Sequence, residues 1–148
     1  MSEKPGGDPL AITLLSEVAV VEQLAQSHLK RALPKGMEVS HFAVLNYLNT
    51  VGEERSPSQL SRSFNVTKGA MTNTLSKLEV AGYVAIRPAW EDARRKLVTI
   101  SPAGQRAWEE ATRAIGPLAQ KIDAELGEDE LKALLRAFRK LRHVLANS

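Results

Sequence analysis

The chain has 148 residues, of which 43% are hydrophobic and 25% are charged, and it contains no cysteine. A chain of this length is expected to form one domain, residues 1–148, with a substantial core. The lack of cysteine excludes disulfides, thiolate metal sites and thiol-based redox sensing on this chain. No apolar run is long enough to cross a membrane and the N-terminus has no signal-peptide core, so a cytoplasmic protein is expected.

The net charge of +3 is distributed unevenly along the chain. Residues 55–100 hold eight basic and three acidic residues, whereas residues 37–54 hold three acidic and no basic ones. Residues 1–36 are neutral, and residues 101–148 carry a single positive excess. An ordinary basic surface would not need to gather its charge in one segment. The concentration in residues 55–100 therefore favours a surface that binds nucleic acid.

The first third of the chain is predicted to be helical. Residues 1–9 contain two prolines and two glycines and are expected to be a flexible lead-in. Residues 10–33 then repeat apolar side chains at helical spacing until Pro-Lys-Gly stops the helix. Such a stripe is more often core or dimer seam than a ligand site. A second helix is predicted for residues 37–51, with Phe42, Leu45 and Leu48 facing inward.

Residues 56–79 are predicted to form two short helices joined by a turn. Ser56 is a hydroxyl N-cap, Pro57 follows at the first helical position, and Gln59 stands where it closes a capping box. Residues 64–66 end this first helix.

The second helix of the pair is capped by Thr67 and runs through residues 68–79. Met71, Leu75 and Leu78 follow one another at i, i+4 and i+7, so they are expected to face inward. The opposite face is small, polar and basic, which suits a groove lined by phosphates.

A charged β-hairpin is predicted after Gly82, where the apolar period changes from 3.6 to 2. Residues 83–87 and 96–100 read as its two strands. The turn between them, residues 88–95, is polar, and three consecutive cations follow one another at its end, Arg94 to Lys96. A helix pair followed by such a hairpin is the pattern of a winged helix-turn-helix, in which one helix reads the major groove and the hairpin reaches the minor groove.

The rest of the chain is predicted to be helical again. Ser101 and Pro102 repeat the helix-start chemistry, and apolar residues then alternate in steps of three and four, as in a coiled-coil seam. Gly116–Pro117 is expected to interrupt and bend this helix. Gly127 is expected to end it, and a last helix with its own apolar stripe follows.

The hairpin carries a resemblance to a known family. Residues 92–94 (Asp-Ala-Arg) followed by residues 98–101 (Val-Thr-Ile-Ser) resemble the wing signature of MarR-family transcriptional regulators. The run from Leu78 to Gly104 follows the pattern of that family without a gap, and the flanking helices fit in number and length. The resemblance implies a mainly α fold: a winged helix-turn-helix, residues 37–100, with a two-stranded antiparallel wing. It also implies that residues 10–33 and 101–146 supply the helices of a homodimer.

Groove contacts are expected from the outward face of the second helix of the pair. Asparagine bonds adenine through both groups of its amide, lysine reaches guanine or phosphate, and the hydroxyls of serine and threonine adapt to several partners. A glycine lets the backbone approach DNA closely. A solvated surface helix would look similar, so this assignment depends on the hairpin beside it. The expected contacts are Thr67, Lys68, Gly69, Thr72, Asn73, Ser76 and Lys77.

Arg94 is the residue expected to enter the minor groove, because a guanidinium suits the narrow, electronegative groove of A·T-rich DNA. Asp92 stands two residues earlier, where a bidentate pair would hold the arginine and shape the turn. The alternative for this pair is a surface salt bridge of little energetic weight. For Trp90 two positions stay open, namely packing on the base of the wing and contact with DNA sugars.

Phosphate contacts are expected from two further groups of residues. One is the basic set of the hairpin, and the other is the start of the first helix of the pair, where backbone N–H groups favour anions. The residues are Arg87, Arg95 and Lys96 in the hairpin, and Ser56, Ser58 and Gln59 at the helix start.

The resemblance also suggests an effector, because MarR-like proteins often bind small aromatic or phenolic carboxylates between the dimer helices and the DNA-binding part. His28, Arg31 and His41 are the residues expected to form a polar corner of such a pocket. The three histidines of the chain lack the spacing of metal ligands, and no cofactor is expected. No nucleophile–base pair, Walker loop or dinucleotide fingerprint is present, so an enzyme is not expected.

The predicted function is sequence-specific binding of double-stranded DNA by a homodimer at a pseudo-palindromic operator. The protein is expected to be a repressor that a small ligand releases from DNA. Two alternatives remain at this stage: a protein that coats DNA without sequence preference, and a winged-helix module that binds proteins.

Overall fold

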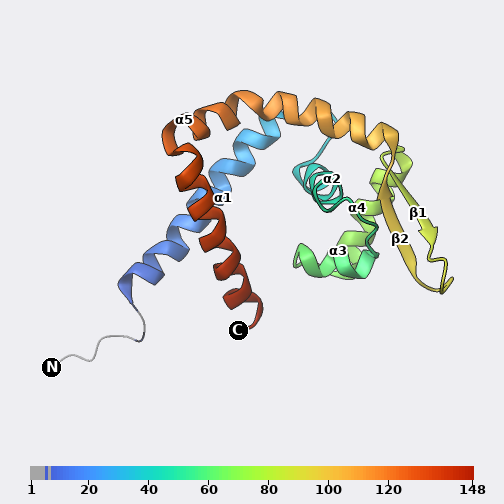
Figure 1. Cartoon of the computed structure of the whole chain (residues 1–148), viewed down its shortest axis with the longest axis horizontal. Helices are drawn as coiled ribbons and strands as arrows, with labels where there is room; N and C mark the ends of the chain where they lie inside the picture. The colour runs from blue at the N-terminus through green and yellow to red at the C-terminus, as the bar shows by residue number, and fades with distance from the viewer. Residues whose placement is uncertain (1–5, 7) are drawn as a thin grey trace. The chain divides into compact units, whose positions relative to one another are not determined.

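The computed structural model of the chain describes residues 6 and 8–148 (Figure 1). In chain order the elements are α1 (Pro9–Ala32), α2 (Val39–Val51), α3 (Pro57–Ser63), α4 (Lys68–Val80), β1 (Val84–Pro88), β2 (Lys96–Ile100) and α5 (Pro102–Ala146). The predicted fold class, mainly α with a two-stranded antiparallel wing, is confirmed. Most of the predicted flexible lead-in, residues 1–5 and 7, lies outside the described residues.

The chain divides into two compact units, one ending at Ala111 and the other spanning Thr112–Ser148. Helix α5 passes from the first unit into the second. All the other helices and both strands belong to the first unit, so the helix pair and the wing are held in one body. None of the helices in the described part of the chain is both long and apolar enough to span a bilayer.

Helix α2 begins two residues later than predicted, at Val39. Glu38 has an extended backbone and serves as the N-cap, and its own N–H donates to His41 Nδ1 at 3.3 Å. The two side chains thereby form a reciprocal capping box. The sequence pattern did not reveal this start because the box uses Glu and His instead of the usual Ser or Thr with Glu or Gln.

The helix pair forms as predicted. Ser56 and Gln59 close the capping box of α3, and Thr67 Oγ1 accepts the N–H of Ala70 at the start of α4. Between the two helices Asn65 has a left-handed backbone, with φ of 50°, which turns the chain. The core of the first unit gathers apolar side chains from α2, α3, α4 and both strands: Val44, Leu45, Leu48, Leu60, Met71, Leu75, Leu78, Val84 and Val98.

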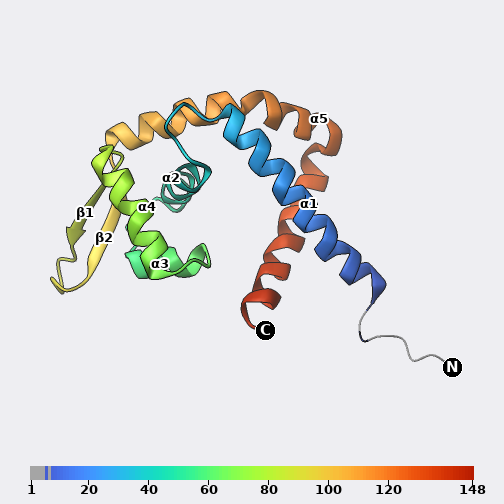
Figure 2. The ribbon, with the colours of Figure 1, turned by 180° about the vertical axis from the view of Figure 1, so that it is seen from behind.

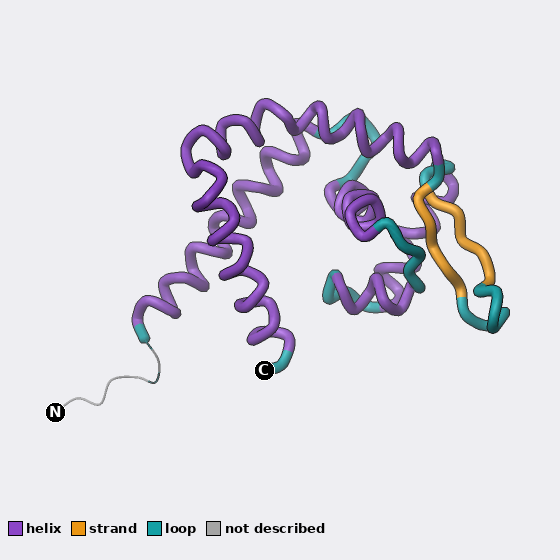
Figure 3. The backbone as a smooth tube through the Cα atoms, viewed as in Figure 1, coloured by secondary structure: helices purple, strands orange, loops and turns teal. Residues whose placement is uncertain are grey.

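The wing is a two-stranded antiparallel sheet in which Val84 pairs with Ile100 and Pro88 with Lys96 (Figure 3). Strand β1 begins one residue later than predicted because the N–H of Tyr83 donates to Leu78 O and completes the turn after α4. Arg55 adds one more pair to the sheet through its bridge with Val98. In the views of Figures 1 and 2 the loop between β1 and β2 projects away from the start of α5.

Helix α5 begins against the wing. Ser101 Oγ accepts the N–H of Gly104, and a Cβ at Gly104 would lie only 2.0 Å from the carbonyl oxygen of Tyr83. The predicted interruption at Gly116–Pro117 is wrong, because the backbone of α5 stays helical there. A helix can continue past a proline at the loss of a hydrogen bond, and the bend expected at this point stays a prediction. The break lies at Gly127, with φ of 78°, where the sequence predicts the end of a helix.

Candidate nucleic-acid interface

The outward side of α4 carries the residues that the sequence predicts for groove contacts. Met71, Leu75 and Leu78 are buried on its inner side, which confirms the predicted orientation of the helix. The outer side, which we call the α4 face, is exposed along its whole length. Its members are Lys68, Gly69, Thr72, Asn73, Ser76 and Lys77.

The α4 face carries one cation near each end, Lys68 and Lys77. Lys77 has its Nζ 3.9 Å from a carboxylate oxygen of Glu38. Both side chains are more than half exposed, so solvent weakens this pair. Lys77 is therefore free to exchange Glu38 for a phosphate at small cost.

Helix α3 is held beside the wing by the backbone. The N–H of Arg55 donates to Val98 O at 3.2 Å, and the N–H of Val98 donates to Arg55 O at 2.7 Å. The next residue, Ser56, caps α3. The start of α3 and the end of the wing loop therefore face each other across a short gap, although about forty residues separate them in the sequence.

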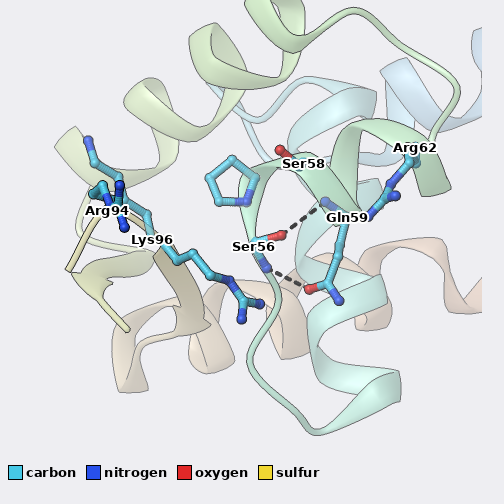
Figure 4. A pocket seen from close by; sticks show the side chains of 8 residues that line it. Ser56, Ser58, Gln59, Arg62, Arg94 and Lys96 are labelled. Atoms are coloured by element: carbon cyan, nitrogen blue, oxygen red, sulfur yellow. Dashed lines mark hydrogen bonds between the residues drawn. The ribbon is translucent and has the colours of Figure 1, made fainter. Parts of the chain in front are cut away.

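This gap is an open cavity of about 440 Å³, which we call the basic cavity (Figure 4). Four of its lining residues are cations, from α3, from the end of the wing loop and from the start of β2, and none is acidic. Such a concentration of positive charge attracts phosphate groups. The lining residues are Ser56, Pro57, Ser58, Gln59, Arg62, Arg94, Arg95 and Lys96.

The basic cavity brings together six of the predicted phosphate or groove residues and adds Arg62, which the sequence analysis missed. Arg62 lies one helical turn after Ser58, so the i, i+4 spacing on α3 was a signal that it shares that face. The side chains of Ser56 and Gln59 are engaged in the capping box. The Ser56 hydroxyl only accepts in this box, so its O–H and the amide NH₂ of Gln59 remain as side-chain donors. The arginines and the lysine supply most of the affinity for anions.

The predicted pair of Asp92 and Arg94 forms, but it is not bidentate. The backbone N–H of Arg94 donates to Asp92 Oδ1 at 3.0 Å, and Arg94 Nε lies 3.4 Å from the same oxygen. Asp92 therefore shapes the turn while the side chain of Arg94 stays 93% exposed. Arg87, in contrast, forms an ion pair with Glu54, so the positive charge of the wing is concentrated after its turn.

Trp90 stands free in the wing loop, with 96% of its surface exposed. Packing on the base of the wing, one of the two positions considered from the sequence, is therefore wrong. Ala89 beside it is buried and anchors the loop.

The structure separates the three residues predicted for an effector pocket. His28 and Arg31 contact each other on α1, with Arg31 Nη2 3.3 Å from His28 Nδ1. His41 instead lines a cavity of about 430 Å³, the His41 cavity, between the α1–α2 loop, α4 and the first turns of α5, and neither His28 nor Arg31 reaches it. Its other charged lining residues are Lys35, Glu38, Lys77 and Glu110.

Burial lowers the pKa of His41 below its ordinary value of 6.5; Glu38 opposes this shift and Lys77 adds to it. The imidazole is thereby kept neutral near pH 7, the form in which Nδ1 accepts the N–H of Glu38. Within residues 6 and 8–148 no cluster of three His, Asp or Glu side chains has the arrangement of a metal site.

Comparison with known proteins agrees with this geometry. Residues 41–118 match the family described as a winged helix DNA-binding domain. The transcriptional activatory protein BadR of Rhodopseudomonas palustris is 34% identical over 97 residues, which are 64% of this chain and 51% of BadR. The chain therefore spans about half the length of that relative.

Two solved structures share the fold over nearly the whole chain. A mutant of MarR from E. coli, complexed with operator DNA, is 26% identical with a TM-score of 0.73, over 91% of this chain and 99% of MarR. The transcriptional regulator BldR from Sulfolobus solfataricus is 23% identical with a TM-score of 0.79, over 93% of this chain and 99% of BldR.

The chain belongs to the winged helix DNA-binding domain family. Its fold is that of the MarR-type transcriptional regulators, so the resemblance predicted from the wing is confirmed, and both family and fold are those of regulators rather than enzymes.

Proposed function

We propose that this protein is a cytoplasmic, sequence-specific regulator that binds a pseudo-palindromic operator in double-stranded DNA as a homodimer. The observation that carries the proposal is the basic cavity, whose four cations lie in the same compact unit as the polar α4 face. Phosphates bound by the cations fix the position of the protein on the duplex, and the α4 face then meets base edges in the major groove. Arg94 enters the adjacent minor groove.

The exposed apolar surface of the terminal helices supports the homodimer. No residue of α1, all of which the structure describes, is buried, although the helix carries seven large apolar side chains that are at least 45% exposed. In the second unit Leu134, Leu135 and Phe138 are also exposed, by 38–53%. Uncovered apolar area of this extent is typical of a subunit interface. A two-fold dimer would present two α4 faces to half-sites about 34 Å apart.

The direction of regulation is proposed to be repression, in which the dimer covers a promoter. BadR carries the name of a transcriptional activatory protein, so activation is the second candidate. A reporter gene behind the bound promoter separates the two: deletion of the regulator raises expression in the first case and lowers it in the second.

The His41 cavity is the proposed place for a small aromatic or phenolic carboxylate effector. Its volume of about 430 Å³ is within the range of small-molecule sites. Lys77 lines the cavity and also belongs to the α4 face, so a bound carboxylate would compete with DNA for the same ammonium group. Such a ligand releases DNA because it binds the DNA-free protein more tightly than the DNA-bound protein. His28 and Arg31 take no part in this revised site.

Binding to DNA from the region flanking the gene, compared with a scrambled duplex of equal length, tests the main proposal. Both duplexes are titrated across a salt series with the wild type and with Arg94→Ala. The expected result is a preference for the first duplex of about a thousandfold or more, and a loss of affinity in the variant.

Two other outcomes contradict the proposal. Equal and steeply salt-dependent affinity for both duplexes identifies a protein that coats DNA through phosphate contacts alone. Absence of binding to either duplex, with a folded dimeric protein, points to the protein-interaction module. Sedimentation of the wild type supplies the mass that decides whether the dimer forms.

A further inference from the structure

Trp90 is the most exposed large apolar side chain among the described residues, with 96% of its surface accessible. The other tryptophan, Trp108, is half-buried, and its indole N–H donates to Asn46 Oδ1 at 3.0 Å. A tryptophan can bury 150–250 Å² of surface, so its full exposure forgoes a large hydrophobic gain. An aromatic side chain in this position is typical of a contact with a partner.

The loop that presents Trp90 is closed by hydrogen bonds on both sides of it. The N–H of Ala89 donates to Arg95 O at 2.8 Å, and the N–H of Arg95 donates to Asp92 O at 3.0 Å. Asp92 Oδ1 accepts the N–H of Arg94 at 3.0 Å. Because the buried Ala89 and these bonds hold the backbone, the indole is presented outward at a small entropic cost to binding.

The charge around Trp90 indicates the kind of partner. Arg94 and Arg95 follow it in the same loop, Lys96 begins β2, and Asp92 is already engaged by Arg94. Glu91 is the other acidic residue of this loop, and the cations outnumber the two acids, so the surface remains positive. A polyanion fits it better than an acidic or apolar protein segment does.

The indole has the chemistry for the minor groove. Its N–H is a donor only, and the minor-groove edges of A·T pairs present only acceptors, as phosphates do. Its flat apolar ring packs against sugars and against the edges of base steps.

We propose that Trp90 is a DNA-contacting residue, whose indole lies against sugars and base edges of the minor groove next to the site that Arg94 enters. The contact is non-ionic and adds affinity that salt does not screen. This inference rests on the proposed function and deepens it, because it assigns a second wing residue to the same interface.

A salt series separates the two wing residues. Trp90→Ala is expected to lower affinity for the preferred duplex about tenfold, as loss of aromatic contacts with nucleic acid does, without change in the slope of log affinity against log salt. Arg94→Ala is expected to lower that slope by about one. Val80→Ala is the matched control, since Val80 is also an apolar side chain that is 90% exposed, and it is expected to bind as the wild type.

Fluorescence gives a direct readout in a Trp108→Phe background, in which Trp90 is the only tryptophan. Saturating DNA is expected to change its emission. Unaltered emission, together with wild-type affinity of Trp90→Ala, overturns the inference while Arg94→Ala still tests the proposed function. A change of the sedimenting mass in Trp90→Ala also overturns it, because Trp90 would then contact a second copy of the chain. Absence of DNA binding by the wild type overturns both proposals together.

Discussion

Arg55 and Val98 exchange two backbone hydrogen bonds, 3.2 and 2.7 Å long, and so join the start of α3 to the second strand of the wing. Val98 is fully buried in the core, which makes this junction rigid. The basic cavity exists because of it, since Arg62 on one side and Arg94 to Lys96 on the other come from elements that the bridge holds together.

Arg62→Ala is expected to weaken binding to the preferred and the scrambled duplex by the same factor, because a phosphate contact carries no sequence information. The slope of log affinity against log salt should fall by about one. Titration of both duplexes at several salt concentrations measures this. Arg113→Ala, an exposed arginine of α5 outside the cavity, is the control and should leave the slope unchanged. A loss confined to the preferred duplex would instead assign Arg62 to base contacts.

Gly104→Ala is expected to lower the free energy of unfolding by about 3 kcal/mol or more, as severe overpacking does. The new Cβ would lie 2.0 Å from the carbonyl oxygen of Tyr83 and 2.9 Å from Ile100 Cγ1, so α5 must shift away from the wing. Urea unfolding followed by circular dichroism measures the change. Gly116→Ala is the control: nothing lies within 4 Å of its Cβ, and it should gain about 0.5–1 kcal/mol. Equal stability of the two variants would contradict the close approach.

Gly69→Ala separates folding from DNA binding. A Cβ at Gly69 meets nothing within 4 Å, so the free energy of unfolding should rise by about 0.5–1 kcal/mol, as expected for alanine in a helix. If the backbone of α4 approaches DNA there, the same methyl group should reduce affinity for the preferred duplex about tenfold, which corresponds to about 1.4 kcal/mol. Unfolding curves and duplex titrations of one preparation give both numbers. A stabilised variant with wild-type affinity would show that the backbone of α4 does not approach DNA closely at Gly69.

His41 is expected to make stability depend on pH. Its pKa is lowered in the folded state, chiefly by burial and further by Lys77, with Glu38 opposing. The unfolded chain therefore binds the proton more readily, so the stabilisation is complete above about pH 6.5 and is lost as pH falls toward the lower, folded pKa. Protonation also removes the acceptor for the Glu38 N–H, which acts in the same direction.

Urea unfolding of the wild type and of His41→Gln between pH 5 and 7.5 measures this effect. Glutamine keeps an acceptor for the cap but does not titrate. The difference in unfolding free energy between the two proteins should change below about pH 6.5 and stay constant above pH 7. If the difference in unfolding free energy were the same at every pH, titration of the His41 imidazole would not contribute to stability.

The sequence predicted a residue's role correctly where that role depends only on neighbouring residues of the same segment. Ser56 and Thr67 cap their helices as predicted, because a cap needs only a hydroxyl and the N–H groups of the next turn. The start of α2 was placed two residues too early, since a Glu–His capping box has no common sequence signature. Arg62 was missed as a site residue because the cations that share its cavity, Arg94 to Lys96, lie more than thirty positions away in the sequence.

The sequence by itself determined the kind of protein. Helical periodicity and capping residues defined the helix pair. The change to a period of two in the apolar residues, together with three consecutive cations, defined the wing. These signals are local, because each depends on residues within a few turns of one another. Only the tertiary structure decided which charges act together. It paired Arg87 with Glu54, left the side chain of Arg94 exposed, and moved His41 into a cavity apart from His28 and Arg31. Such pairings depend on long-range packing, which no spacing within one segment encodes.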